Sequence, residues 1–166
     1  MTGGRCLPLR WTRRQAGMMD CPWTALHVDS GSILSEAAKA RGWKPRARLV
    51  AMSNVGDSPT LMLNAPVPAA RKVLAKAGLT VDDIDLWEIN EAFAVVAEKF
   101  IRDLKLDRDK VNVNGGSIAL GHPIGATGAM LIGTVLDELE RRDLRRGLVT
   151  MCAAGGMAPA IIIERI

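Results

Sequence analysis

Tyrosine is absent from this 166-residue sequence and phenylalanine occurs only twice, so the core has to be built mainly from aliphatic side chains. Three cysteines without paired spacing argue against a disulfide-bonded scaffold and for a reducing compartment. No run of about 18 uncharged apolar residues occurs, which argues against a membrane partner. Because 48% of the residues are hydrophobic, the composition is that of a globular domain rather than a disordered chain.

The excess of positive charge, formally +4, lies in the first quarter of the chain. Residues 1–48 hold nine of the 22 Lys and Arg side chains, three of the 18 acidic ones, and three of the four tryptophans. Arginine interleaved with tryptophan can bind single-stranded nucleic acid by stacking and phosphate contact. The alternative interpretation is an atypical Arg/Trp-rich segment at 1–32, solvated or disordered, in which Pro8 and Pro22 interrupt any regular period. Because the rest of the chain is slightly acidic, we expect no nucleic-acid partner.

Targeting signals are weak. Residues 1–19 contain four arginines and no acid, as transit peptides do, but they contain no serine. A continuous apolar leader is missing, and residues 163–166 are not a peroxisomal Ser-Lys-Leu signal. A cytoplasmic location is therefore the default expectation.

Helical and strand patterns alternate over residues 33–166, which we interpret as one domain. Pro66 and Pro68 suit the first turn of a helix, and Gly42 and Gly78 suit helix ends. From residue 46 the order β-α-β-α-β-α-β-β predicts an α/β fold: a mixed sheet with helices on both faces and the last strand added antiparallel by a hairpin. The expected helices cover 33–41, 66–77, 92–104 and 127–142, and the expected strands cover 46–53, 85–89, 110–114, 147–153 and 157–164.

Three groups of residues that could carry chemistry follow expected strands. They are Asn-Glu-Ala-Phe at 90–93, the glycine-rich stretch at 112–128, and Met-Cys-Ala-Ala-Gly-Gly-Met at 151–157. In open α/β sheets, ligands bind outside the carboxyl ends of the parallel strands. We therefore expect the three groups to converge in space.

Each candidate residue also has a structural interpretation. His122 could be an ordinary hydrogen-bonded histidine, although its place between glycines and a proline favours a catalytic role. Cys152 could be a buried thiol, although the glycines after it would let a ligand approach. Asn90 could cap the following helix, and Glu91 could favour that helix's dipole.

Other sites that use glycine, histidine or cysteine do not fit. The stretch 121–128 has neither the Lys-Ser/Thr pair of a P-loop nor the glycine spacing of a dinucleotide site. Only one other histidine, His27, is present, and the spacing of His122 and Cys152 is not that of a zinc site. We therefore expect no metal.

Taken together, three motifs resemble one family. They are Asn-Glu-Ala-Phe, Gly-His-Pro-Ile-Gly-Ala-Thr-Gly and the cysteine before Gly-Gly-Met. They are similar to the C-terminal half of a thiolase (acetyl-CoA acetyltransferase or 3-ketoacyl-CoA thiolase), over about residues 33 to 166. The resemblance implies an acyl-CoA C-acyltransferase that cleaves 3-ketoacyl-CoA with CoA or condenses two acyl-CoA units. Acyl-CoA and CoA would be small-molecule substrates, and no metal or bound redox cofactor would be needed.

The resemblance also implies roles for individual residues. His122 would activate a nucleophilic cysteine and donate to the thioester oxygen, and Asn90 would hold a water that completes this oxyanion hole. Cys152 would exchange a proton with the acetyl α-carbon. Such a carbon acid is weak, so its carbanion needs aligned donors at the oxygen and a nearby proton carrier. The substrate-binding residues would be Phe93 at the acyl pocket, the backbone N–H of Ala154 in a second oxyanion hole, and Gly155.

The length of the chain does not fit a complete thiolase. The family has two similar halves, and its nucleophilic cysteine lies in the N-terminal one; neither Cys6 nor Cys21 stands in a matching motif. We therefore expect a truncated chain that is functional only with a missing half. The alternative is a non-catalytic thiolase-like assembly module. Either way, a homo-oligomer or an association with a full thiolase chain is expected, because the uncovered face should be apolar.

Overall fold

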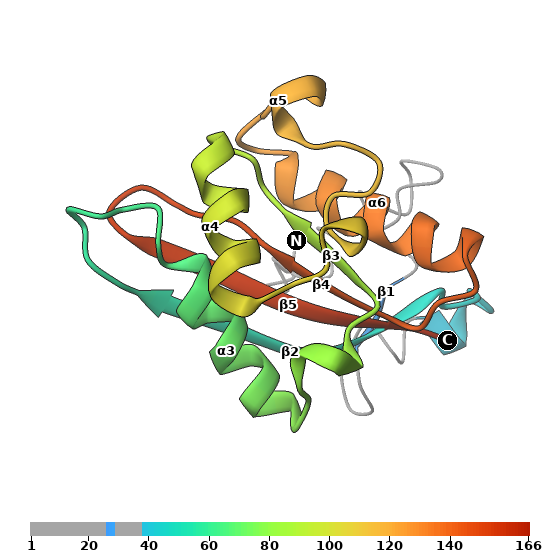
Figure 1. Cartoon of the computed structure of the whole chain (residues 1–166). Coiled ribbons are helices and arrows are strands. Elements are labelled where there is room, and N and C mark those ends of the chain that lie inside the picture. Colours follow the sequence, from blue (N-terminus) through green and yellow to red (C-terminus); the bar gives the residue numbers. More distant parts are fainter. Residues whose placement is uncertain (1–25, 29–37) are drawn as a thin grey trace, which may run out of the picture.

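A computed structural model of the chain describes residues 26–28 and 38–166, and at its centre lies a five-stranded mixed sheet (Figure 1). The strand order is β1-β2-β5-β4-β3. β1 pairs parallel with β2, β3 pairs parallel with β4, and β5 runs antiparallel to both of its neighbours. The strands are β1 (Leu26–Val28), β2 (Ala47–Gly56), β3 (Leu86–Ile89), β4 (Arg146–Thr150) and β5 (Met157–Arg165).

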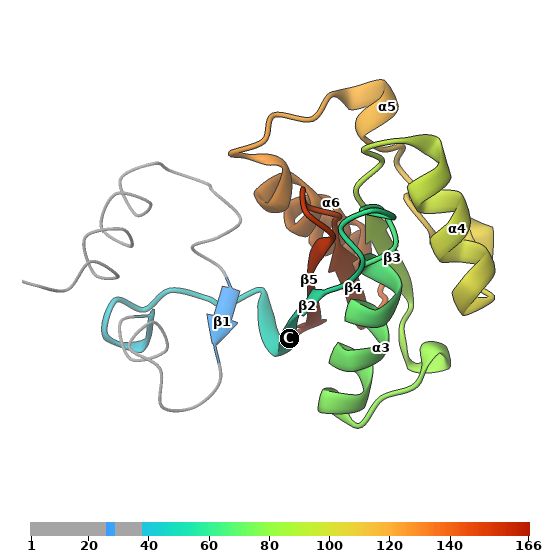
Figure 2. The same ribbon diagram turned by 90° about the vertical axis from the view of Figure 1, so that its left-hand side faces the viewer.

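Helices cover both faces of the sheet, as Figure 2 shows in a view along the layers. α3 (Pro66–Ala77) and α4 (Ala94–Leu104) lie on one face, and α6 (Thr127–Arg141) lies on the other. The short α5 (Ser117–Leu120) projects beyond the sheet, and two 3-10 turns, η2 (Val81–Asp83) and η3 (Arg108–Lys110), complete the connections. The predicted α/β class with helices on both faces is confirmed.

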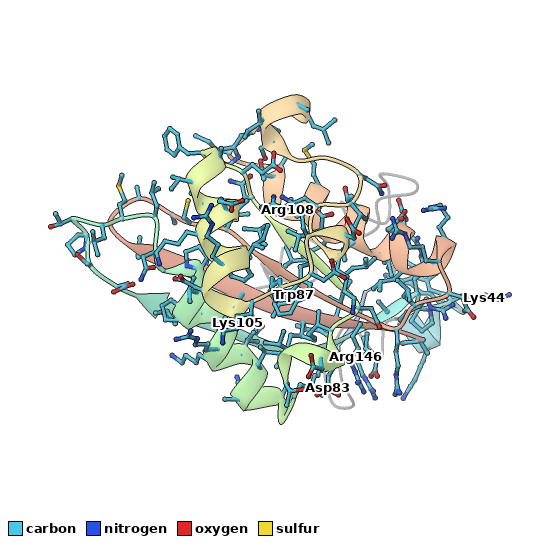
Figure 3. The ribbon with its side chains drawn as sticks, viewed as in Figure 1. Lys44, Asp83, Trp87, Lys105, Arg108 and Arg146 are labelled. Carbon is cyan, nitrogen blue, oxygen red and sulfur yellow. The ribbon has the colours of Figure 1, made fainter. Side chains whose placement is uncertain are left out.

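The core under α3 and α4 is largely aliphatic, with one aromatic pair. Trp87 of β3 meets Phe100 of α4 edge to face, with 5.9 Å between ring centroids. Figure 3 shows Trp87 at the centre of the molecule. Both rings are buried among Val73, Ile89 and other aliphatic side chains. Full burial of each such side chain is worth about 1.5–3 kcal/mol, so this packing fixes β3 against α4.

The core under α6 is wholly aliphatic. Leu131, Val135 and Leu139 lie on the same stripe of the helix and pack against Leu86 and Val149 of the sheet. Gly147 of β4 makes the close approach possible, because a Cβ there would lie 2.6 Å from Val135 Cγ2. The first turn of α6 is thereby held close to the carboxyl ends of β3 and β4.

The outer edge of β2 is paired over only part of its length. β1 covers Ala47–Leu49, and no other described strand pairs with that edge. Further along β2, the carbonyl oxygens of Met52 and Asn54 accept hydrogen bonds from the ammonium groups of Lys76 (3.3 Å) and Lys72 (3.0 Å) of α3.

Several expected boundaries shift. The stretch 110–114 is not a strand: it contains the last residue of η3, one parallel bridge between Val111 and Trp87, and a turn. The helix expected at 92 begins at Ala94, because Phe93 is extended. Of the expected helix 33–41, residues 38–40 are helical and Arg41 lies in a turn, whereas residues 33–37 lie outside the described residues. The segment 1–32 also lies outside the described residues, except for β1, a strand that the sequence did not predict.

Candidate active site

The candidate site begins at the carboxyl ends of the neighbouring parallel strands β3 and β4. Asn90 directly follows β3, is fully buried, and donates its backbone N–H to the carbonyl of Thr150 at the end of β4 (3.0 Å). Cys152 comes two residues after Thr150. The sheet register thus places the first and third sequence motifs side by side at one end of the sheet.

Asn90 is brought together with His122. The amide nitrogen Nδ2 of Asn90 lies 3.4 Å from Nε2 of His122. On its other side, the Asn90 Oδ1 accepts a hydrogen bond from the Ser117 hydroxyl at 2.5 Å. The Ser117 hydroxyl holds the amide oxygen on this side, and the NH₂ group lies toward the imidazole.

His122 is held from its far side by Thr127. The Thr127 hydroxyl lies 2.8 Å from His122 Nδ1 and donates its own hydrogen to the carbonyl of Pro123 (3.0 Å). Since that hydroxyl has only one hydrogen, its oxygen accepts from Nδ1–H. Nε2 of a neutral imidazole then carries the lone pair and faces the Asn90 amide. Thr127 is buried while His122 is exposed, so a fixed residue orients an accessible one.

Cys152 is near the pair in the fold but is not bonded to it. Within the described part of the chain, the thiol makes no side-chain hydrogen bond to Asn90 or His122, and it packs against the core on the α3 side. Burial raises the pKa of the Cys152 thiol above its usual value, so the group is protonated at neutral pH.

The turn after Cys152 is tightly fixed. Ala153 and Met157 exchange backbone hydrogen bonds of 2.7 and 3.2 Å, and Gly155 and Gly156 both have a φ of 79°. At Gly156 a Cβ would lie 2.7 Å from the carbonyl oxygens of Asp57 and Ser58. Only glycine fits there, so the loop after β2 sets the position of the turn.

The expected substrate-binding residues are accessible. Phe93 is 60% exposed at the start of α4, and Ala154 and Gly155 are exposed in the turn. Their roles stay predictions.

Glu91 does not lie in a helix, contrary to the structural interpretation of its sequence position. One carboxylate oxygen accepts from Asn112 Nδ2 (3.0 Å) and the other from the backbone N–H of Ile118 (3.2 Å). Ser117, Thr127 and Asn112 were missed as supporting residues. The only signal was that all three lie within the glycine-rich stretch at 112–128.

A second acidic side chain lies beneath the site. Glu88 on β3 is 2% exposed and, because β-strand side chains alternate, faces the same side of the sheet as Asn90. Burial, together with the charges of Glu91 and Glu138, raises the pKa of Glu88 to about 8. Glu88 lines a cavity of about 20 Å³, enough for one water, whose walls include Ser117 and Thr127.

Neither a metal centre nor a membrane helix is found among the described residues. No three His, Cys, Asp or Glu side chains gather there in an arrangement that could hold a metal ion. No helix of residues 38–166 is long and apolar enough to span a bilayer.

Comparisons with known proteins point to one family. The family model described as "Thiolase, C-terminal domain" matches residues 43–165. The steroid 3-ketoacyl-CoA thiolase of Mycobacterium tuberculosis is 54% identical over 130 residues, which are 78% of this chain and 32% of the relative. An acetyl-CoA acetyltransferase of Paracoccus denitrificans is 50% identical over 133 residues, which are 80% and 34%.

A solved structure agrees with the sequence comparisons. The crystal structure of the Bacillus anthracis acetyl-CoA acetyltransferase superposes with a TM-score of 0.76 at 46% identity, covering 79% of this chain and 33% of that one. The chain therefore spans about a third of the length of the relatives it matches.

Proposed function

Because the chain belongs to the thiolase family through its C-terminal domain, we propose that it supplies one side of an acyl-CoA C-acyltransferase site. The reaction would be thiolytic cleavage of a 3-ketoacyl-CoA or the reverse Claisen condensation, with CoA as a substrate. The observation that carries the proposal is the Asn90–His122 pair, with the amide NH₂ turned toward Nε2.

His122 would act first as a base and then as a donor. The contact of the Nε2 lone pair with the Asn90 amide is long for a hydrogen bond, at 3.4 Å, and a nucleophilic thiol would take the place of the amide there. Nε2 can then accept the thiol proton, which leaves the thiolate that attacks an acyl group. The resulting imidazolium carries N–H on both nitrogens. Nε2–H can then donate to the thioester oxygen, while Thr127 still accepts from Nδ1–H.

Asn90 would complete the donor set at the same oxygen. Its amide is held by Ser117 and would bind a water near Nε2. The backbone N–H of Ala154 would serve the second oxyanion hole, next to Gly155, and Phe93 would line the acyl pocket.

Cys152 would be the acid and base at the α-carbon. In the cleavage direction, its thiol gives a proton to the carbanion that leaves; in the condensation direction, its thiolate takes one. The raised thiol pKa supports the acid role, because the proton is present at neutral pH.

Cys152 is the one cysteine among the described residues. The nucleophilic cysteine would therefore come from elsewhere. The exposed face beside the site supports association with the remainder of a thiolase, either in the same polypeptide or in a second chain. Its exposed apolar side chains include Ile124 at 89%, and those of Phe93, Val95, Ile118 and Leu120.

A chimera would test the catalytic proposal. Residues 43–165 replace the matching third of the Paracoccus denitrificans acetyl-CoA acetyltransferase, and CoA-dependent loss of acetoacetyl-CoA is measured. We expect turnover from the chimera, and losses of at least about a hundredfold for His122→Ala and Cys152→Ala. Asp109→Asn, on the exposed η3, is the control and should retain activity.

The alternative is a non-catalytic assembly module, which the same exposed apolar face favours. A folded chimera that binds CoA substrates but shows no turnover would favour this alternative. Full activity in His122→Ala would contradict the catalytic proposal.

A further inference from the structure

Glu91 joins the two chain segments that surround Asn90. On one side its carboxylate accepts from Asn112 Nδ2, and the Asn112 side chain also bonds both the N–H and the carbonyl of Ile89 (2.8 and 2.9 Å). On the other side the carboxylate accepts from the N–H of Ile118, the neighbour of Ser117. The carboxylate therefore ties the end of β3 to the start of α5.

The backbone is shaped to accept this carboxylate. A Cβ built on Gly116 would lie 2.2 Å from Glu91 Cδ and 2.4 and 2.5 Å from its two oxygens. Gly116 has a φ of −139°, which any residue can adopt, so space rather than conformation requires glycine here. The head group of Glu91 thus lies directly against the chain immediately before Ser117.

The contacts form a continuous path to the imidazole. Glu91 fixes Ile118, the adjacent Ser117 donates to Asn90 Oδ1, and this bond holds the Asn90 amide against His122 Nε2. An amide flip at Asn90 would place an oxygen opposite the Nε2 lone pair, which is repulsive. The Nε2 lone pair therefore selects the orientation of the Asn90 amide, and Ser117 determines its position.

We propose that Glu91 is a positioning residue of the site, which holds the Asn90 amide against the His122 imidazole through Ser117. This inference rests on the proposed function for its meaning in catalysis, but its geometry can be tested without turnover. Glu91 itself does not touch His122, so it acts through the residues that it holds.

The test uses the full 166-residue chain and nitrogen-15 NMR of the Asn90 side-chain amide and the His122 ring. Glu91→Gln keeps the size of the side chain but turns an NH₂ group toward either the Ile118 N–H or the Asn112 NH₂, both of which are donors. We expect both reporters to shift in Glu91→Gln. Glu98→Gln, on the neighbouring α4 and paired with Arg102 and Arg108, is the matched control and should leave them in place. A folded Glu91→Gln with unchanged Asn90 and His122 signals would overturn the proposal.

A double-mutant cycle covers the case in which Glu91→Gln does not fold. Gly116→Ala should destabilise the wild-type chain and should cost clearly less in Glu91→Ala, because the group that its methyl would meet is gone. Equal costs in the two backgrounds would contradict the contact.

The chimera adds a kinetic readout. There, Glu91→Gln should lower kcat about tenfold to a hundredfold and leave KM nearly unchanged, as expected for misplacement of groups that act in the transition state. An inactive parent chimera would contradict the proposed function and leave the NMR result standing. An active chimera with a wild-type kcat in Glu91→Gln would contradict the role of Glu91 alone.

Discussion

The amide of Asn90 and the imidazole of His122 lie 3.4 Å apart, although 32 residues separate them in the chain. Neither side chain is placed by its own element alone. Asn90 is held by Ser117 and His122 by Thr127, so two neutral hydroxyls support the pair from its two sides. The predictions below test these supports and the packing around them.

Thr127→Val should shift the tautomer equilibrium of the His122 imidazole. Valine keeps the shape of the side chain but leaves Nδ1–H without its acceptor, so Nε2–H becomes populated. Nitrogen-15 NMR of the ring would show the change, and unfolding in urea should show a loss of about 1–3 kcal/mol. Thr134→Val, one half-buried position further along α6, is the control and should preserve the ring spectrum. An unaltered tautomer in Thr127→Val would contradict the assigned hydrogen bonds.

Glu88→Gln should flatten the pH dependence of stability between about pH 4.5 and 8. Because the pKa of Glu88 rises from 4.5 to about 8 on folding, the folded chain binds a proton that the unfolded chain has released. Wild-type stability should therefore fall with rising pH in this window, by up to about 1.4 kcal/mol per pH unit. Urea unfolding at pH 5 and pH 8 measures the slope.

Glu98→Gln is the control for the pH experiment. Ion pairs with Arg108 and Arg102 lower the pKa of Glu98, so its titration falls below this window and its loss should preserve the slope. The burial assigned to Glu88 would be refuted if Glu88→Gln and the wild type gave parallel pH profiles.

Gly156→Ala should destabilise the chain more than Gly155→Ala does. The two glycines share a φ of 79°, so both substitutions carry the conformational cost of about 1 kcal/mol. Only at Gly156 does the added methyl meet backbone, at 2.7 Å from two carbonyl oxygens, whereas the space at Gly155 is open. Overpacking should add about 1–3 kcal/mol to the loss in free energy of unfolding. Equal losses would show that the loop after β2 yields to the methyl.

Alkylation of Cys152 should be slow at pH 7 and should accelerate as the pH rises past 9. The thiolate is the reactive form, and burial raises the pKa of this thiol. The rate of iodoacetamide labelling in a Cys6→Ser/Cys21→Ser background measures it, with a small unstructured thiol peptide as the reference. Labelling of Cys152 faster than the peptide at pH 7 would mean that a neighbouring group activates the thiol.

The sequence patterns were sufficient to predict the long helices and to predict that two of the motifs lie close together. Apolar periodicity located α3, α4 and α6, and the rule that ligands bind at strand ends brought Asn90 and His122 together. The four residues of α5 are too few for a helical period, and the role of Glu91 depended on whether α4 starts at residue 92 or 94. The supporting roles of Ser117 and Thr127 were not predicted, because the hydrogen-bond partner of a single hydroxyl is known only from the folded structure.

The two lysines of α3 that reach the open edge of β2 bear on how copies of this chain would meet. A strand from another molecule that added to this edge would have to bond the carbonyls of Met52 and Asn54. It would displace the ammonium groups of Lys76 and Lys72 from these carbonyls and bury them away from water. The sheet is therefore guarded against growth into a fibre at the edge that β1 leaves uncovered.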